Sequence, residues 1–92
     1  MEKIVDNQSL VLQYLPGFGA WTYHLRLPNT QQIEGKWGFM KVSGTIDGFP
    51  VKNINLAPRT GEDKIISINK KIRDEIGKTG GDTVVVDLYL HT

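Results

Sequence analysis

Apolar and polar side chains alternate along most of the chain, in short runs that end at turn residues. In residues 21–27 every second position is aromatic or aliphatic, and Pro28 ends the run. Successive side chains of a strand point to opposite faces, so this alternation is typical of a sheet with one buried face. The pattern returns in residues 40–47 and 84–91. We therefore expect an all-β fold.

Turn signals separate these runs. Pro16-Gly17 suits the centre of a type II turn, and Asp47-Gly48 is typical of a two-residue hairpin, because both of its positions tolerate a positive φ. Residues 57–61 and 80–82 are also turn-like in composition. The runs between the turns predict six strands, at residues 10–15, 21–27, 40–47, 51–56, 65–68 and 84–91.

One segment has a different period. Ile72 and Ile76 lie four residues apart, as on one face of a helix. Asn69 can cap the start of that helix, and Gly77 can adopt the left-handed conformation that often ends one. We predict a two-turn helix between the fifth and sixth strands.

The size of the chain favours a closed sheet. An open sheet of six short strands leaves two unpaired edges, whereas closure removes the edges and buries the single apolar face. Ninety-two residues are one domain's length, and no repeat or linker divides them. We predict one domain over residues 1–92, a closed six-stranded barrel with one short helix.

Composition excludes several classes of partner and compartment. The chain has no cysteine, so it contains neither a disulfide framework nor a thiolate metal site. Eleven basic and ten acidic residues give a net charge of +1, which creates no strong field for nucleic acid or an anionic membrane. The sequence contains no apolar run of secretory or membrane-spanning length. We expect a cytoplasmic protein without a membrane partner.

Four segments occur in a characteristic order: Trp21-Thr22-Tyr23, then residues 42–50 (VSGTIDGFP), then Ile72-Arg73, then Gly81-Asp82-Thr83-Val84. In these segments the chain resembles a prokaryotic domain of unknown function, DUF1905, over about residues 10–90. The resemblance implies a six-stranded Greek-key barrel and offers no catalytic residue to transfer. Related proteins often continue into a segment associated with bacteriocin protection. This sequence stops at Thr92 before such a segment, so we do not extend its function to this chain.

Residue types that could carry chemistry are few. His24 and His91 are the only histidines, and both alternate with apolar neighbours, so we expect both to point outward. Ser9, Ser43 and Ser67 lie in or beside strands, rather than in the glycine-flanked turn that exposes a hydrolase nucleophile. We therefore predict no catalytic residue, no metal site and no cofactor.

Four residues are candidates for ligand binding. Trp37 and Phe39 follow the longest polar connection, where an aromatic side chain is either a core plug or the floor of a binding surface. Arg59 and Arg73 belong to a locally basic part of the chain. Such basic residues either form a site for an anion or are charges on a solvated surface. We expect these four residues to lie near the mouth of the barrel.

The function predicted from these observations is a non-enzymatic binding or protein-interaction module for a small anionic ligand or a protein partner. One alternative is single-stranded nucleic-acid binding on an aromatic platform, against which the near-neutral charge argues. Another is an accessory enzyme subunit with His24 or Asp47 as acid or base. We expect a monomer or a weak homo-oligomer.

Overall fold

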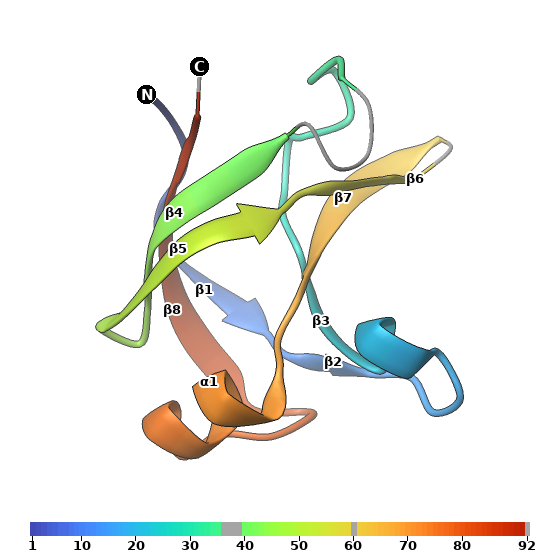
Figure 1. The fold of residues 1–92 in the computed structure, drawn as a ribbon, viewed down its shortest axis with the longest axis vertical. Helices are drawn as coiled ribbons and strands as arrows, with labels where there is room; N and C mark the ends of the chain where they lie inside the picture. The colour runs from blue at the N-terminus through green and yellow to red at the C-terminus, as the bar shows by residue number, and fades with distance from the viewer. Residues whose placement is uncertain (36–39, 60, 92) are drawn as a thin grey trace.

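The computed structural model describes residues 1–35, 40–59 and 61–91 of the chain. Over these residues the protein is mostly β, as predicted, with one short α-helix between the last two strands (Figure 1). The strands are β1 (Glu2–Val11), β2 (Gln13–Tyr14), β3 (Tyr23–Arg26), β4 (Lys41–Ile46), β5 (Phe49–Asn55), β6 (Ala57–Arg59), β7 (Glu62–Ser67) and β8 (Thr83–Leu90). The helical elements are the 3-10 turn η1 (Gly19–Trp21) and the helix α1 (Lys70–Ile76). None of the helices in this part of the chain has the length and apolar character needed to cross a bilayer.

The strands form two antiparallel sheets of four, in the orders β1-β8-β4-β5 and β2-β3-β7-β6. The pairing recorded for the described residues therefore gives two sheets rather than one closed cylinder. Two long stretches of chain take part in both sheets, because only Leu12 separates β1 from β2 and only Leu56 separates β5 from β6. The structure has more strands than the six predicted partly because each of these stretches is interrupted at its leucine.

The Asp47-Gly48 turn has the predicted geometry. Ile46 pairs with Phe49, so two residues connect β4 to β5, and Asp47 and Gly48 have φ values of 49° and 80°. Both turn positions of this hairpin require positive φ, which aspartate and glycine tolerate. The Asp47 carboxylate also accepts a hydrogen bond from the Val85 N–H at 2.6 Å, and thereby joins the hairpin to β8.

The predicted helix is confirmed at both ends. The Asn69 side chain accepts a hydrogen bond from the Ile72 N–H at 2.9 Å, and Gly77 is left-handed with a φ of 66°. Ile72 is buried and anchors α1 to the core. The first residues of α1 are thus fixed relative to β5, beside which they lie.

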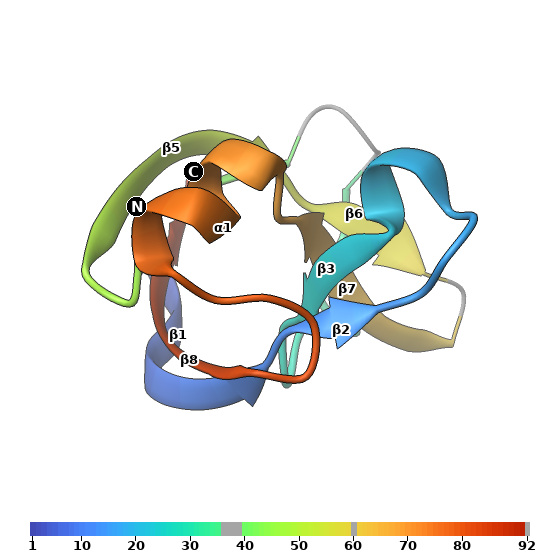
Figure 2. The same cartoon turned by 90° about the horizontal axis from the view of Figure 1, so that it is seen from below.

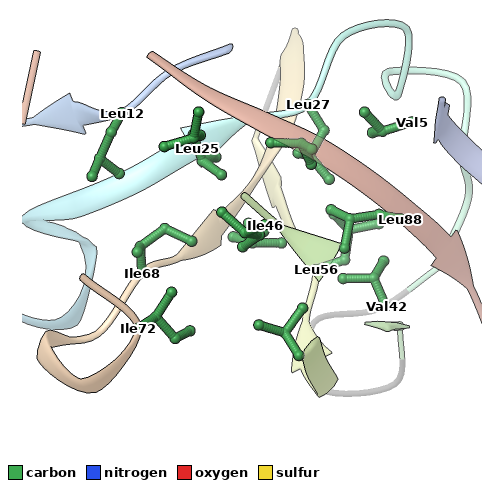
Figure 3. Packing of buried hydrophobic residues seen from close by; sticks show 14 of the residues in the cluster. Val5, Leu12, Leu25, Leu27, Val42, Ile46, Leu56, Ile68, Ile72 and Leu88 are labelled. Atoms are coloured by element: carbon green, nitrogen blue, oxygen red, sulfur yellow. The ribbon is translucent and has the colours of Figure 1, made fainter. Parts of the chain in front are cut away.

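The core takes its side chains from both sheets and from α1. Figure 3 shows side chains of β3, β4, β8 and α1 converging between the sheets. Leu12 and Leu56, the two residues between paired strands, are almost fully buried. The buried cluster consists of Val5, Leu12, Leu25, Leu27, Met40, Val42, Ile46, Val51, Leu56, Ile66, Ile68, Ile72, Val84, Val86 and Leu88.

Several strand boundaries differ from the predicted ones. β3 begins at Tyr23 rather than at residue 21, because Trp21 belongs to η1, and β7 begins at Glu62 rather than at residue 65. β1 begins at Glu2 rather than at residue 10, because its pairing with β8 continues through register irregularities near Val5 and Asn7. These irregularities break the strict alternation by which the sequence pattern identifies strands. β6 occupies residues predicted as a turn, because Ala57 and Arg59 pair with β7. Pairing with a neighbouring strand overrides the turn-like composition there.

Candidate functional site

Of the four residues chosen from the sequence, the structure describes Arg59 and Arg73. Trp37 and Phe39 lie outside the described residues. Arg59 is the last residue of β6 and is exposed, whereas Arg73 lies in α1. Figures 1 and 2 place the β6–β7 hairpin and α1 on opposite sides of the molecule. Arg59 and Arg73 thus lie on separate elements, and ligand contact by either stays a prediction.

Arg73 holds α1 against the second sheet. Its guanidinium group donates a hydrogen bond to the Ile68 carbonyl at 2.7 Å and lies 3.7 Å from the centre of the Tyr23 ring. The Tyr23 ring in turn packs against Tyr14, with 4.9 Å between ring centres. A cation over an aromatic face is attracted by the ring's negative surface. Arg73 thus contributes to the fold.

The two histidines have different environments, and the outward prediction is wrong for His24. Its side chain is buried, and Nδ1 donates a hydrogen bond to the Trp21 carbonyl at 2.8 Å. The ring turns inward because the 3-10 turn just before β3 presents that carbonyl to it. His91 is exposed, as predicted, and its Nε2 lies 2.7 Å from Ser43 Oγ.

The Ser43–His91 pair is half of the arrangement used by hydrolases, which activate a hydroxyl with a neighbouring imidazole. The Asn53 N–H donates to Ser43 Oγ at 3.0 Å, so this N–H is bonded to the hydroxyl itself. Among the described residues, the His91 ring donates no hydrogen bond to a carboxylate that would orient it. The pair therefore joins the end of β8 to β4 and β5 without completing a catalytic triad.

Acidic and imidazole side chains do not gather into a metal-binding group over residues 1–35, 40–59 and 61–91. The polar hollow beside the β6–β7 hairpin is lined by Asn29, Gln31, Gln32 and Asp63. All four lining residues are polar or charged, so the hollow has no aliphatic or aromatic side chain in its lining.

A groove, called here the α1 groove, lies between η1, β5 and α1. It consists of two adjoining hollows of about 280 Å³ each. The first is lined by Ala20, Trp21, Ile54, Asn55, Ser67, Asn69 and Ile72, and the second by Phe49, Pro50, Val51, Lys52, Ile54, Asn69, Lys71 and Ile72. Ile54, Asn69 and Ile72 line both hollows, which therefore adjoin. Figure 2 shows η1 and α1 at the same end of the molecule.

Specific hydrogen bonds place the wall formed by η1. The Ser67 hydroxyl at the end of β7 donates to the Ala20 carbonyl, and His24 donates to the Trp21 carbonyl. The 3-10 turn is thereby held beside the start of α1. From the sequence alone, His24 was a candidate general acid or base. In the structure its side chain bonds to the backbone of Trp21, which lines the groove.

The polar groups of the α1 groove are hydrogen-bond donors and cations. Asn55 Oδ1 accepts from Lys41 Nζ at 2.5 Å, and Asn69 Oδ1 accepts from the Ile72 N–H. One lone pair of each amide oxygen is thereby engaged, and the NH₂ group of each asparagine remains a donor for a ligand. Lys52 and Lys71 line the second hollow, and neither hollow is lined by an aspartate or glutamate.

Comparison with known proteins identifies the family. The family model described as a domain of unknown function, DUF1905, matches residues 11–88. The chain belongs to the DUF1905 family. No curated protein and no solved structure matches the chain. The matched part of this DUF1905 domain includes every residue that lines the α1 groove.

Sequence reasoning missed the groove of this DUF1905 domain. Trp21 was interpreted as one residue of a strand face and Asn69 as a helix cap. Ile54 was interpreted as an ordinary strand residue. Their meeting depends on three segments far apart in the chain, and no local spacing signals it. The aromatic residues chosen instead, Trp37 and Phe39, were selected for their place after a long polar connection.

Proposed function

We propose that this DUF1905 domain is a non-enzymatic binding module that holds a small ligand in the α1 groove. The observation that carries the proposal is the composition of the groove. Trp21, Ile54 and Ile72 supply apolar surface, and Asn55 and Asn69 supply hydrogen-bond donors. Small-molecule sites are concave and mostly apolar, with a few convergent polar groups that orient the ligand.

The size of the groove restricts the ligand. Each hollow has a volume of about 280 Å³. Sites for drug-sized molecules have volumes of about 300–1,000 Å³. A ligand that fills one hollow and extends into the next is therefore small, and the proposal is for a metabolite-sized molecule rather than a folded protein.

The test is an NMR titration of the ¹⁵N-labelled chain with three probes that share an eight-carbon tail: octanoate, octyltrimethylammonium and octyl glucoside. We expect at least one probe, below its micelle concentration, to shift the amide signals of Ala20, Trp21, Ile54, Ser67 and Asn69. Ala20→Leu adds a side chain to the first hollow and should abolish these shifts. Val85→Leu, at an exposed position on β8, is the control. Absence of shifts at the groove with all three probes would contradict the proposal.

We also propose that the two sheets behave as one closed six-stranded barrel. The hydrogen bonds at the two connecting leucines support this. The Leu12 N–H donates to the Asp82 carbonyl at 2.8 Å, and the Leu56 N–H donates to the Met40 carbonyl at 2.9 Å. Pairing thus continues through the two points at which the chain passes from one sheet to the other.

A cytoplasmic location and a monomeric or weakly self-associating state are part of the proposal. A chain without cysteine gains nothing from an oxidising compartment, which supports the location. Cell fractionation tests the location, and sedimentation velocity at several protein concentrations tests the state of association. Recovery of the protein in a membrane fraction would reject the cytoplasmic location. A stable oligomer at micromolar concentration would reject the monomeric or weakly associating state.

Single-stranded nucleic-acid binding is a second candidate, supported by exposed aromatic side chains near β2. Tyr14 and Phe18 are 54% and 47% exposed, and base stacking needs such faces. Phosphate contacts strengthen as salt falls, so filter binding of a thymidine oligonucleotide at low and moderate salt tests this candidate. Absence of retention at low salt rejects it.

A further inference from the structure

We infer that the ligand of the α1 groove is a small amphipathic carboxylate, with its apolar part beside Trp21 and its carboxylate beside Lys52 and Lys71. This inference rests on the proposed function above and adds the chemical class and orientation of the ligand. Three observations support it. Only one of the two hollows is lined by charged residues, the two lysines there form no ion pair with a described residue, and the β5 edge carries residues that disfavour an added strand.

The two hollows differ in charge. No charged residue lines the first hollow, where Trp21, Ile54 and Ile72 provide apolar surface. The second hollow is lined by two lysines and by no acidic residue. A molecule lying along both hollows therefore meets an apolar environment at one end and a positive one at the other. A ligand with one apolar part and one anionic group matches this arrangement.

Among the described residues, neither lysine of the second hollow belongs to an ion pair. Lys70, the neighbour of Lys71, lies 2.6 Å from Asp74 Oδ2. The other recorded pairs involve Lys3, Arg26 and Lys78, and neither Lys52 nor Lys71 is in any of them. An anion bound at this end would gain two attractive charges without breaking an existing pair.

The β5 edge favours a small molecule over an added peptide strand. Among the described residues β5 pairs with β4 alone, and the same stretch of chain pairs with β7 only from β6 onward, so the other edge of β5 faces the groove. Pro50 has no N–H to donate to an incoming strand, and Lys52 places a charge on the same edge. Proline and lysine are residues that protect an edge strand from further pairing. The occupant is therefore held by side chains.

The experiment compares the affinities of the same three probes by calorimetry. We expect octanoate to bind more tightly than octyl glucoside, and octyltrimethylammonium to bind most weakly. Lys52 and Lys71 are exposed, and exposed ion pairs are weak. The double variant Lys52→Gln/Lys71→Gln should therefore weaken octanoate binding by about threefold to tenfold. The same variant should leave octyl glucoside binding unchanged.

Lys70→Gln is the matched control, because Lys70 is a neighbouring lysine on the same helix that is already paired with Asp74. It should leave octanoate binding unchanged. Octanoate affinity should also fall as salt is raised, because screening weakens the attraction between exposed charges. The glucoside affinity should show no such fall.

Three outcomes would overturn the inference. Equal binding of octanoate and octyl glucoside at the groove would exclude the carboxylate preference but leave the proposed function intact. Absence of groove shifts with every probe would overturn both. Binding to anionic phosphatidylglycerol vesicles without binding of free octanoate would assign the lysines to a lipid surface, which is a different occupant.

Discussion

Asp47 joins the β4–β5 hairpin to β8 through both its backbone and its side chain. Its N–H donates to the Val85 carbonyl at 2.7 Å, and its Oδ1 accepts from the Val85 N–H at 2.6 Å. Its Oδ2 lies 3.4 Å from Lys78 Nζ. The residue also has the positive φ that the turn requires. The sequence predicted this last role of Asp47, but not its contacts with a strand 38 residues away.

Replacing Asp47 tests these contacts. Asp47→Ala removes the acceptor of a charge-assisted hydrogen bond and places alanine at positive φ, so we expect a loss of about 2–4 kcal/mol in the free energy of unfolding. Asp47→Asn keeps an acceptor and tolerates the turn conformation, so it should lose less than about 1.5 kcal/mol. Urea denaturation measures both. Equal losses in the two variants would show that the side-chain acceptor is unimportant.

Lys3 is a residue for which a pH effect can be predicted. Its Nζ lies 3.0 Å from both Asp6 Oδ1 and Asp87 Oδ1, and 5.3 Å from the centre of the Tyr89 ring. The hydrogen bond to Asp6, and to a lesser extent the one to Asp87, raises the pKa of Lys3 above its ordinary value. The stabilisation from the charged form is complete below the ordinary lysine pKa of about 10.4 and is lost only as pH rises through the raised pKa.

The prediction is that Lys3 titrates above the ordinary lysine pKa of about 10.4. NMR of the lysine side chains over an alkaline pH series measures this directly. Asp87→Asn should lower the pKa of Lys3 towards the ordinary value. A Lys3 signal that titrates at the ordinary lysine pKa of about 10.4 in the unaltered chain would contradict the ion pairs.

At the scale of elements, the best-predicted parts are those whose geometry is set by neighbouring residues. The Asp47-Gly48 hairpin and the caps of α1 depend on contacts a few residues apart, and their sequence signals were sufficient. The start of β1 and the whole of β6 depend on pairing with distant strands, β8 and β7. Local composition does not record such pairing.

At Gly44, β4 and β8 approach each other so closely that a side chain on β4 has no space. A Cβ atom at Gly44 would overlap the carbonyl of Asp87 on β8. We expect Gly44→Ala to reduce the free energy of unfolding by more than about 3 kcal/mol, because backbone atoms must move to admit the methyl group. At Gly48, with a φ of 80°, an added Cβ has open space, so Gly48→Ala should lose only about 1–2 kcal/mol from its backbone conformation. Thermal unfolding of the two variants compares them, and a smaller loss for Gly44→Ala would contradict the close approach.

At the scale of the whole molecule, the candidate site could not be predicted because no single segment contains it. The α1 groove exists only where η1, β5 and α1 meet, and its position depends on two side-chain hydrogen bonds to the η1 backbone, from Ser67 and His24. The predicted site at Trp37, Arg59 and Arg73 assumed a common barrel mouth. Arg59 lies in β6 and Arg73 in α1, on opposite sides of the molecule, and the predicted site remains to be tested.

Barrel closure predicts slow amide exchange at the two leucines between strands. If the sheets open and close as one unit, the Leu12 and Leu56 amides should exchange with deuterium as slowly as the amides of Ile46 and Val86 within the sheets. If the sheets move independently, exchange at the two leucines should be markedly faster. Hydrogen exchange followed by NMR distinguishes these cases. Markedly faster exchange at Leu12 and Leu56 would refute barrel closure.

The pairing of Glu2 with Leu90 brings the two ends of the chain together, as Figure 1 also shows. Ends that lie side by side can be linked covalently, and a chain can often be reopened at an exposed turn without loss of fold. Gly61, an exposed turn residue just before β7, is such a place. A circularly permuted chain with its new ends at this turn should fold and retain the α1 groove. Its groove could then be brought close to a fused partner in an orientation that the natural order of strands does not allow.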